Sequence, residues 1–305
     1  HPIFFGRCAN SSQCITSSNR NTPMTFAKLT PQLLIDNDHM VGSLFVKECR
    51  PLNPTQLTTP ILMVHGSNHG WWAWRVWQPF FAAAGWPTYA LSLRGHYGSA
   101  PVNENDFLNL TMSDYVEDIA SVARWLGKPP ILMGHSLGGI VVQKAAETVS
   151  SAAIALIASI GPSAIGRQRP GPPPPMDKPV FPTKAEALER WMYDPWPEER
   201  FDQFYECLTP ESPGVLATSG TGLTDVNAEL IKCPVLCVGG SEDKSYVPKA
   251  EKLAKIYNAD WFEQPDAGHD MMLESASLDV AQQINQWLIG KLGLERSSKI
   301  QAMTP

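Results

Sequence analysis

The chain has 305 residues with a formal net charge of −6, and 43% of its residues are hydrophobic. That apolar content supports a globular fold, and the acidic balance leaves no basic stripe for binding nucleic acid or an anionic membrane surface. No apolar run approaches the ~20 residues of a membrane-spanning helix. We therefore expect small molecules to be the partners of this chain.

Residues 1–30 are polar and rich in Ser and Asn, and we predict that they form a loose N-terminal extension. They lack the basic start and apolar stretch of an intact signal peptide, which favours a cytoplasmic location, although secretion after removal of a signal stays open. Cys8 and Cys14 could pair only in an oxidising compartment. Cys233 and Cys237 would stand ~13 Å apart on one strand, which is too far for a disulfide.

Beyond the extension, strand-like and helix-like segments alternate. Short apolar runs stopped by glycine are typical of parallel strands buried on both faces. The predicted strands cover residues 39–50, 60–66, 87–93, 130–134, 152–161, 234–240 and 259–264. The predicted helices cover residues 70–85, 113–127 with Ser113 as the N-cap, 138–149, 249–257 and 278–293. The alternation predicts an α/β fold with a mostly parallel, doubly wound sheet of about eight strands.

One segment, residues 162–227, breaks this alternation. It contains the proline run 171–175 and then aromatic, acidic, helix-compatible sequence. We interpret it as a helical cap inserted after the sixth strand, over the carboxyl edge of the sheet, where such folds bind ligands. The α/β core then comprises residues 31–161 and 228–295. A disordered linker between two domains is the alternative, which the tryptophans and phenylalanines of the segment disfavour.

The sequence GHSLG places Ser136 between two glycines where a buried strand meets a helix. A turn this abrupt strains the backbone of its central residue and brings its neighbours close, so Gly134 and Gly138 are needed on either side. The serine hydroxyl would then stand above the sheet at a helix N-terminus, where backbone N–H groups point at a developing anion. This arrangement predicts a nucleophile.

A serine nucleophile requires a base and a carboxylate. Asp243 lies just past the end of a predicted strand, and His269 lies in the turn after the next one. Both are expected at the same sheet edge as Ser136, in the chain order Ser, Asp, His. Glu242 is the alternative carboxylate.

Five motifs, HGSNHG, LRGHYGS, GHSLGG, GGSED followed by VP, and GHDMM, occur in this order between Pro60 and Trp287. In this combination the chain resembles serine-nucleophile members of the α/β-hydrolase superfamily. The resemblance implies that Ser136 is the nucleophile, His269 the general base and acid, and Asp243 the carboxylate that orients the imidazole. The N–H groups of Leu137 and Ser67 are the expected oxyanion donors.

The remaining histidines have structural interpretations. His65 and His96 are typical turn residues, and we expect His135 to pack beneath the serine turn. His69 is left open between a structural role and a place in the substrate cleft. No set of His, Asp, Glu or Cys has the spacing of metal ligands, and no glycine-rich phosphate loop follows a strand, so we expect neither a metal nor a cofactor.

Four tryptophans lie in the stretch WWAWRVW. Trp71, Trp74 and Trp77 recur every three residues and are predicted to face the core. Trp72 points elsewhere and favours an aromatic cleft shared with the cap. The predicted substrate-binding residues are Asn68, His69, Trp72 and Trp191.

The chemistry best supported is hydrolysis of an ester, thioester or lactone of a small, largely apolar substrate through an acyl-enzyme. Epoxide hydrolases and haloalkane dehalogenases resemble this family but need an aspartate where Ser136 stands. The motifs look most like the branch of plant methylesterases and hydroxynitrile lyases, yet the lyase threonine and lysine positions hold Gly66 and Asp270. A carbon–carbon hydrolase or a biosynthetic cyclase on the same fold stays open, as does a non-catalytic receptor.

Overall fold

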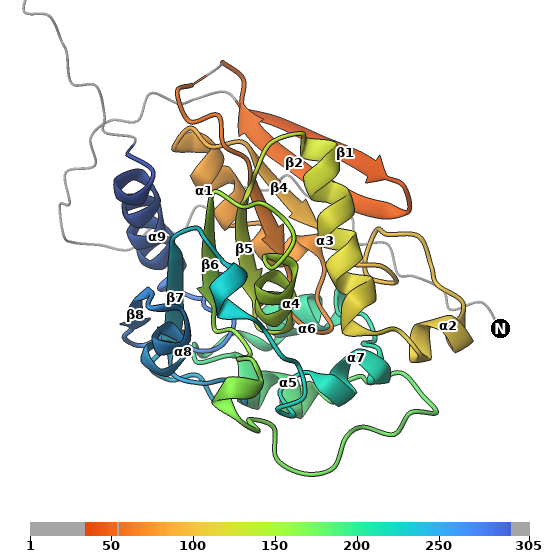
Figure 1. Ribbon diagram of the computed structural model, residues 1–305. Helices are drawn as coiled ribbons and strands as arrows, with labels where there is room; N and C mark the ends of the chain where they lie inside the picture. Colours follow the sequence, from red (N-terminus) through yellow and green to blue (C-terminus); the bar gives the residue numbers. More distant parts are fainter. Residues whose placement is uncertain (1–33, 54, 294–305) are drawn as a thin grey trace, which may run out of the picture.

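The computed structural model describes residues 34–53 and 55–293. The predicted extension 1–30, with Cys8 and Cys14, lies outside the described residues. Eight strands form one sheet in the order β1-β2-β4-β3-β5-β6-β7-β8 (Figure 1). The strands are β1 Leu34–Val41, β2 Leu44–Pro51, β3 Ile61–Val64, β4 Thr88–Leu91, β5 Ile131–His135, β6 Ala153–Ile157, β7 Val235–Gly240 and β8 Asp260–Gln264.

Helices connect most of the strands. The α-helices are α1 Trp77–Ala83, α2 Glu104–Leu108, α3 Met112–Leu126, α4 Leu137–Ala145, α5 Lys184–Trp191, α6 Glu198–Glu206, α7 Pro213–Thr218, α8 Ala250–Tyr257 and α9 Ser277–Lys291. Short 3-10 turns are η1 Trp71–Trp74, η2 Ser163–Ile165 and η3 Ala228–Leu230. Within the described part of the chain, no helix combines the length and the apolar character needed to cross a bilayer.

The sheet confirms the predicted α/β architecture. Strands β3 to β8 pair in parallel, and β2 joins them through an antiparallel pairing with β4. The predicted single strand over 39–50 is wrong, because β1 and β2 form an antiparallel hairpin there. Gly42 adopts φ +63°, a left-handed conformation that glycine reaches without steric cost, and this turns the chain between the two strands.

The central strands are buried on both faces and divide their side chains between two cores. In β3, Ile61 and Met63 join the core under α1 and α9, whereas Leu62 and Val64 join the core under α3, α4 and α8. All four side chains are fully buried. The sequences of the parallel strands are therefore continuous apolar runs, because neither face of the sheet is exposed to water there.

Two predicted helices differ in detail from the structure. Helix α3 begins one residue before Ser113, and its N-cap is Thr111, whose backbone N–H and hydroxyl both donate to the Asp114 carboxylate, at 2.8 and 2.7 Å. This reciprocal capping box satisfies two groups at once, so the prediction of Ser113 as the cap is wrong. The helix predicted over 70–85 is divided into η1 and α1.

The segment between β6 and β7 contains α5, α6 and α7, which lie together at one end of the sheet, below it in Figure 1. We call residues 162–227 of this segment the insertion. Phe201 and Phe204 of α6 join the first core and Val215 of α7 joins the second, so the insertion packs on the sheet domain through apolar contacts. Two of the aromatic residues that suggested a folded segment, Phe201 and Phe204, are thus buried.

Asn68, in the loop after β3, also ties the insertion to the sheet domain. Its side-chain amide donates to the carbonyl oxygens of Val180 and Thr209, each at 2.9 Å, and its own carbonyl accepts from the Thr209 N–H at 2.8 Å. Asn68 holds φ +65°, which asparagine tolerates better than most residues. The loop that follows β3 and the insertion therefore form one hydrogen-bonded unit.

Candidate active site

Ser136 stands at the sharp turn from β5 into α4, as the N-cap of that helix, with φ +52° and ψ −116°. Its N–H donates to Ile157 O at 3.0 Å, and its carbonyl accepts from the Ile160 N–H at 3.1 Å, which fixes the strained backbone. A Cβ on Gly134 would collide with the carbonyl of Gly138, and one on Gly138 with the carbonyl of His65. The crowding predicted from the two glycines is therefore present.

His269 and Asp243 meet at the same edge of the sheet. Asp243 follows β7 and His269 follows β8, and His269 Nδ1 lies 2.9 Å from Asp243 Oδ2. Burial alone would lower the pKa of His269, but the charge and hydrogen bond of Asp243 offset it and raise that pKa above its ordinary value. Glu242 is exposed and its carboxylate accepts from the neighbouring Ser241 hydroxyl instead.

A cavity of about 230 Å³ opens between the sheet domain and the insertion, and both Ser136 and His269 line it. Ser67 lies on the same wall. Leu137 is the first residue of α4, where a helical N–H has no partner within the helix. The structure thus groups at one cavity three of the five residues expected to act in chemistry, with Leu137 next to Ser136 in the chain and Asp243 paired with His269.

Two of the predicted substrate-binding residues line this cavity and two do not. Asn68 and Trp191 are part of its wall. His69 and Trp72 are 1% and 5% exposed and lie outside it, which corrects the expectation that they face the cleft. The Trp72 ring stacks on the imidazole of His69 with centroids 5.2 Å apart, so each covers the other.

His69 forms a buried ion pair with Asp270. Its Nε2 lies 3.0 Å from Asp270 Oδ2 and its Nδ1 lies 2.7 Å from Ser67 O. Both ring nitrogens of His69 therefore face protein oxygen atoms. Burial would raise the pKa of Asp270, but the charge and hydrogen bond of His69 outweigh it and lower that pKa. This resolves the open question about His69 in favour of a structural contact.

The other turn histidines are buried and hydrogen-bonded. His135 Nε2 donates to His269 O at 3.1 Å, and burial together with the nearby His269 charge holds the pKa of His135 well below its ordinary value. His65 Nε2 accepts from the Leu93 N–H at 3.1 Å. His96 Nε2 lies 3.2 Å from Glu211 Oε2, a contact that joins the sheet domain to the insertion.

Three potential ligand atoms cluster beneath the cavity, which the sequence spacing did not indicate. Those of His135, His269 and Asp270 lie within 4.8 Å of one another, and all three residues are buried. Each of the three residues has a protein partner, which is a backbone carbonyl for His135, Asp243 for His269 and His69 for Asp270, while His135 Nδ1 and Asp270 Oδ1 have no hydrogen-bond partner among the described residues. These contacts account for the cluster, so we assign no metal to it.

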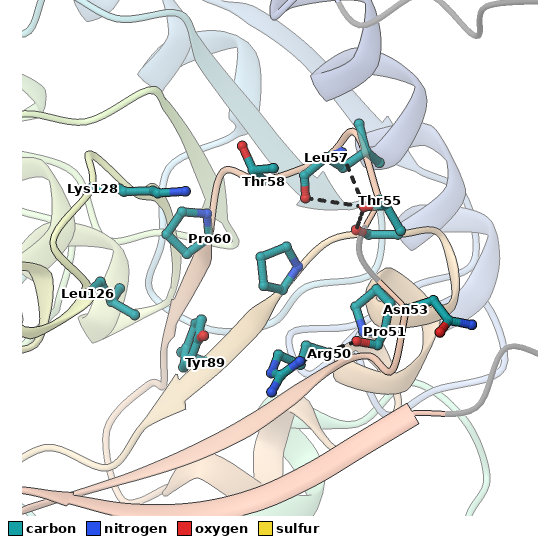
Figure 2. Close-up of a pocket in the computed structure, with 12 residues that line it drawn as sticks. Arg50, Pro51, Asn53, Thr55, Leu57, Thr58, Pro60, Tyr89, Leu126 and Lys128 are labelled. Carbon is teal, nitrogen blue, oxygen red and sulfur yellow. Dashed lines mark hydrogen bonds between the residues drawn. The ribbon is translucent and has the colours of Figure 1, made fainter.

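A second cavity, of about 320 Å³, lies at the opposite edge of the sheet, where Pro60 precedes β3 and Pro87 precedes β4. Figure 2 shows its wall, which includes Arg50, Tyr89 and Lys128. Among the described residues that line it there is no histidine, cysteine or acidic side chain. The residues that line this second cavity therefore indicate a reaction less clearly than those of the cavity over Ser136.

Several residues of the Ser136 cavity carry no recognisable sequence motif. Arg169, Arg190 and Ser219 come from the insertion, and Tyr246 comes from the loop after β7. Their positions depend on how the insertion folds back over the sheet. No local spacing in the sequence encodes that arrangement.

The sequence matches the Alpha/beta hydrolase family over residues 61–283, and the chain belongs to that family. A stretch of 88 residues, 28% of this chain, is 38% identical to methyl jasmonate esterase 1 of Vitis vinifera and spans 33% of that protein. The chain thus matches about one third of the length of this curated relative.

Solved structures share the fold. A methylesterase, MES16, from Arabidopsis superposes with a TM-score of 0.61 at 20% identity, covering 75% of this chain and 98% of that one. A thermophilic esterase from Thermogutta terrifontis superposes with a TM-score of 0.61 at 21% identity, covering 85% and 98%.

Proposed function

We propose that the chain is a carboxylic ester hydrolase that forms an acyl-enzyme on Ser136. The observation that carries the proposal is that Ser136, on a strained turn at a helix N-terminus, lines one cavity with His269, whose other ring nitrogen bonds Asp243. The relative named as a methyl jasmonate esterase adds support over the stretch that matches. The insertion would act as the cap over this cavity.

In the first half of the reaction, Ser136 Oγ attacks the carbonyl carbon of the ester. Since Nδ1 of His269 is committed to Asp243, the proton of the hydroxyl passes to Nε2, and Asp243 stabilises the imidazolium that forms. The negative oxygen of the tetrahedral intermediate is held by the N–H groups of Ser67 and Leu137. The ester C–O bond then breaks, and the leaving alcohol takes the proton from His269.

In the second half, water replaces the alcohol. His269 takes a proton from the water as its oxygen attacks the acyl carbon, and the bond to Ser136 Oγ breaks as His269 returns the proton to that oxygen. The free acid leaves and the hydroxyl is restored. Each proton and each broken bond is thus accounted for by three side chains, the oxyanion donors and one water.

The test is hydrolysis of p-nitrophenyl esters from acetate to decanoate, with fluorophosphonate labelling of the serine as a second readout. Ser136→Ala should lower kcat by about 10⁴- to 10⁶-fold and abolish labelling. Ser121→Ala, on the outer face of α3, is the matched control and should retain both. Turnover that survives Ser136→Ala would overturn the assignment of the nucleophile.

A further inference from the structure

The wall of the Ser136 cavity that the insertion forms carries two arginines. Arg169 and Arg190 both line the cavity, together with Glu186 and the buried Ser219. Arg190 is paired, because its guanidinium lies 3.2 Å from Glu186 Oε1. The other oxygen of Glu186 is also committed, since it accepts from the backbone N–H and hydroxyl of Thr183 at 2.8 and 2.9 Å.

Arg169 has no such partner. Its backbone N–H donates to Gly220 O at 2.8 Å, which fixes the residue against the loop after α7. Within residues 34–53 and 55–293, no ion pair or side-chain hydrogen bond engages its guanidinium. Burial and the charge of Arg190 lower the pKa of Arg169, so both act against its positive charge. A half-buried guanidinium beside a second one is unfavourable unless an anion compensates it.

Ser219 supplies an independent observation at the same wall. It is 2% exposed and lines the cavity, yet its hydroxyl has no hydrogen-bond partner among the described residues. Buried polar groups are ordinarily paired, and an unpaired one calls for a ligand or a functional reason. Ser219 directly precedes Gly220, which accepts the Arg169 N–H, so the orphan hydroxyl and the unpaired cation belong to one local structure.

We infer that this wall binds a carboxylate of the substrate, with Arg169 as the charge partner and Ser219 as a hydroxyl donor. The substrate would then be a small ester that carries a second, ionised carboxyl group away from the bond to be cleaved. A guanidinium matches a planar carboxylate with two parallel donors. The 230 Å³ cavity is smaller than typical drug-sized sites, which favours a short molecule. The role of this wall in catalysis rests on the proposed ester hydrolysis. The binding of a carboxylate to Arg169 and Ser219 does not depend on that proposal.

The kinetic test compares charged and neutral esters of matched shape. With the carboxylate on the acyl side, the pair is mono-4-nitrophenyl adipate and 4-nitrophenyl hexanoate. With it on the alcohol side, the pair is 4-acetoxybenzoate and 4-acetoxybenzamide. We expect wild type to favour the charged member of at least one pair in kcat/KM. Arg169→Gln should lower that preference by about 10- to 100-fold, the range for losing a hydrogen bond to a charged group.

Three variants control this comparison. Arg169→Lys keeps the charge but loses the two parallel donors, so it should retain part of the preference. Ser219→Ala should lower the preference by a smaller factor than Arg169→Gln. Arg124→Gln changes the net charge equally on the exposed side of α3, where Arg124 pairs with Glu117, and should retain the full preference. An equal loss in Arg124→Gln and Arg169→Gln would overturn the site.

A binding arm separates the carboxylate site from the esterase. Monomethyl adipate is titrated by calorimetry into Ser136→Ala and into the double variant with Arg169→Gln, with methyl hexanoate as the neutral comparison. Binding of the charged ester that weakens about tenfold or more with Arg169→Gln supports the site even if no ester is hydrolysed. Hydrolysis that depends on Ser136 but shows no preference in either pair would overturn the carboxylate site and leave the ester hydrolase standing.

Discussion

His269 and Asp270 are neighbours in the chain, yet they belong to two histidine–carboxylate pairs in opposite surroundings. His269 pairs with Asp243 on the wall of the cavity that Ser136 also lines. Asp270 pairs with His69 in the interior, covered by the Trp72 ring. The sealed pair commits both imidazole nitrogens to protein oxygens. The open pair leaves one nitrogen for chemistry, so the surroundings of a pair decide whether it can react.

The largest expected contrast is between the two histidines. His269→Gln should lower kcat for ester hydrolysis by about 10⁴- to 10⁶-fold, because no base remains to take the serine proton. His69→Gln should act mainly on stability, because His69 does not reach the cavity. Steady-state kinetics and thermal unfolding of both variants make the comparison. Equal losses of kcat in the two variants, with both still folded, would contradict the distinction between the two histidines.

The carboxylate behind the base gives the next largest effect. Asp243→Asn should lower kcat by about 10⁴-fold, since an amide stabilises the wrong tautomer of His269 and cannot stabilise its charged form. Glu242→Gln is the matched control one residue away and should leave kcat almost unchanged. If the two outcomes were exchanged, Glu242 would be the carboxylate of the triad.

The sealed pair should dominate stability. Asp270→Asn removes the buried carboxylate that pairs with His69, and we expect it to lower the free energy of unfolding by about 3–5 kcal/mol, measured by urea denaturation. Glu251→Gln, which removes the exposed pair with Lys255 on α8, is the control and should have little effect. A similarly small effect for both variants would argue against a buried ion pair.

The smallest expected effect is on the pH dependence of kcat/KM, through which the two histidine–carboxylate pairs are linked. His269 must be neutral to accept a proton, so kcat/KM should rise with pH through the raised pKa of His269 and then level off. The negative charge of Asp270 contributes to raising that pKa. Asp270→Asn should therefore move the rising limb of the kcat/KM profile to lower pH. A move to higher pH would contradict the assigned charge of Asp270.

The sequence predicted the features that local rules govern. The glycines around Ser136 indicate crowding at the turn from β5 into α4, and the apolar runs indicate strands buried on both faces. This turn and the parallel sheet could therefore be inferred from the sequence. The hairpin at Gly42 was missed because one glycine in a strand-like run does not distinguish a turn from a bulge.

The wall of the cavity was harder to infer. Trp191 lines it as predicted, whereas Trp72 is turned inward against His69 by packing that involves residues far apart in the chain. Arg169 and Ser219 reach the site only through the path of the insertion, for which no periodicity or motif exists. Tertiary packing, rather than propensity, decides these positions.

The hydrogen bonds of Asn68 have a mechanical consequence. The residue follows Ser67, and three hydrogen bonds join it to Val180 and Thr209 of the insertion. A movement that lifts this part of the insertion must either break those bonds or pull the loop after β3 with it. Such a movement of the insertion would therefore also shift the loop that holds Ser67, the residue that we propose as an oxyanion donor.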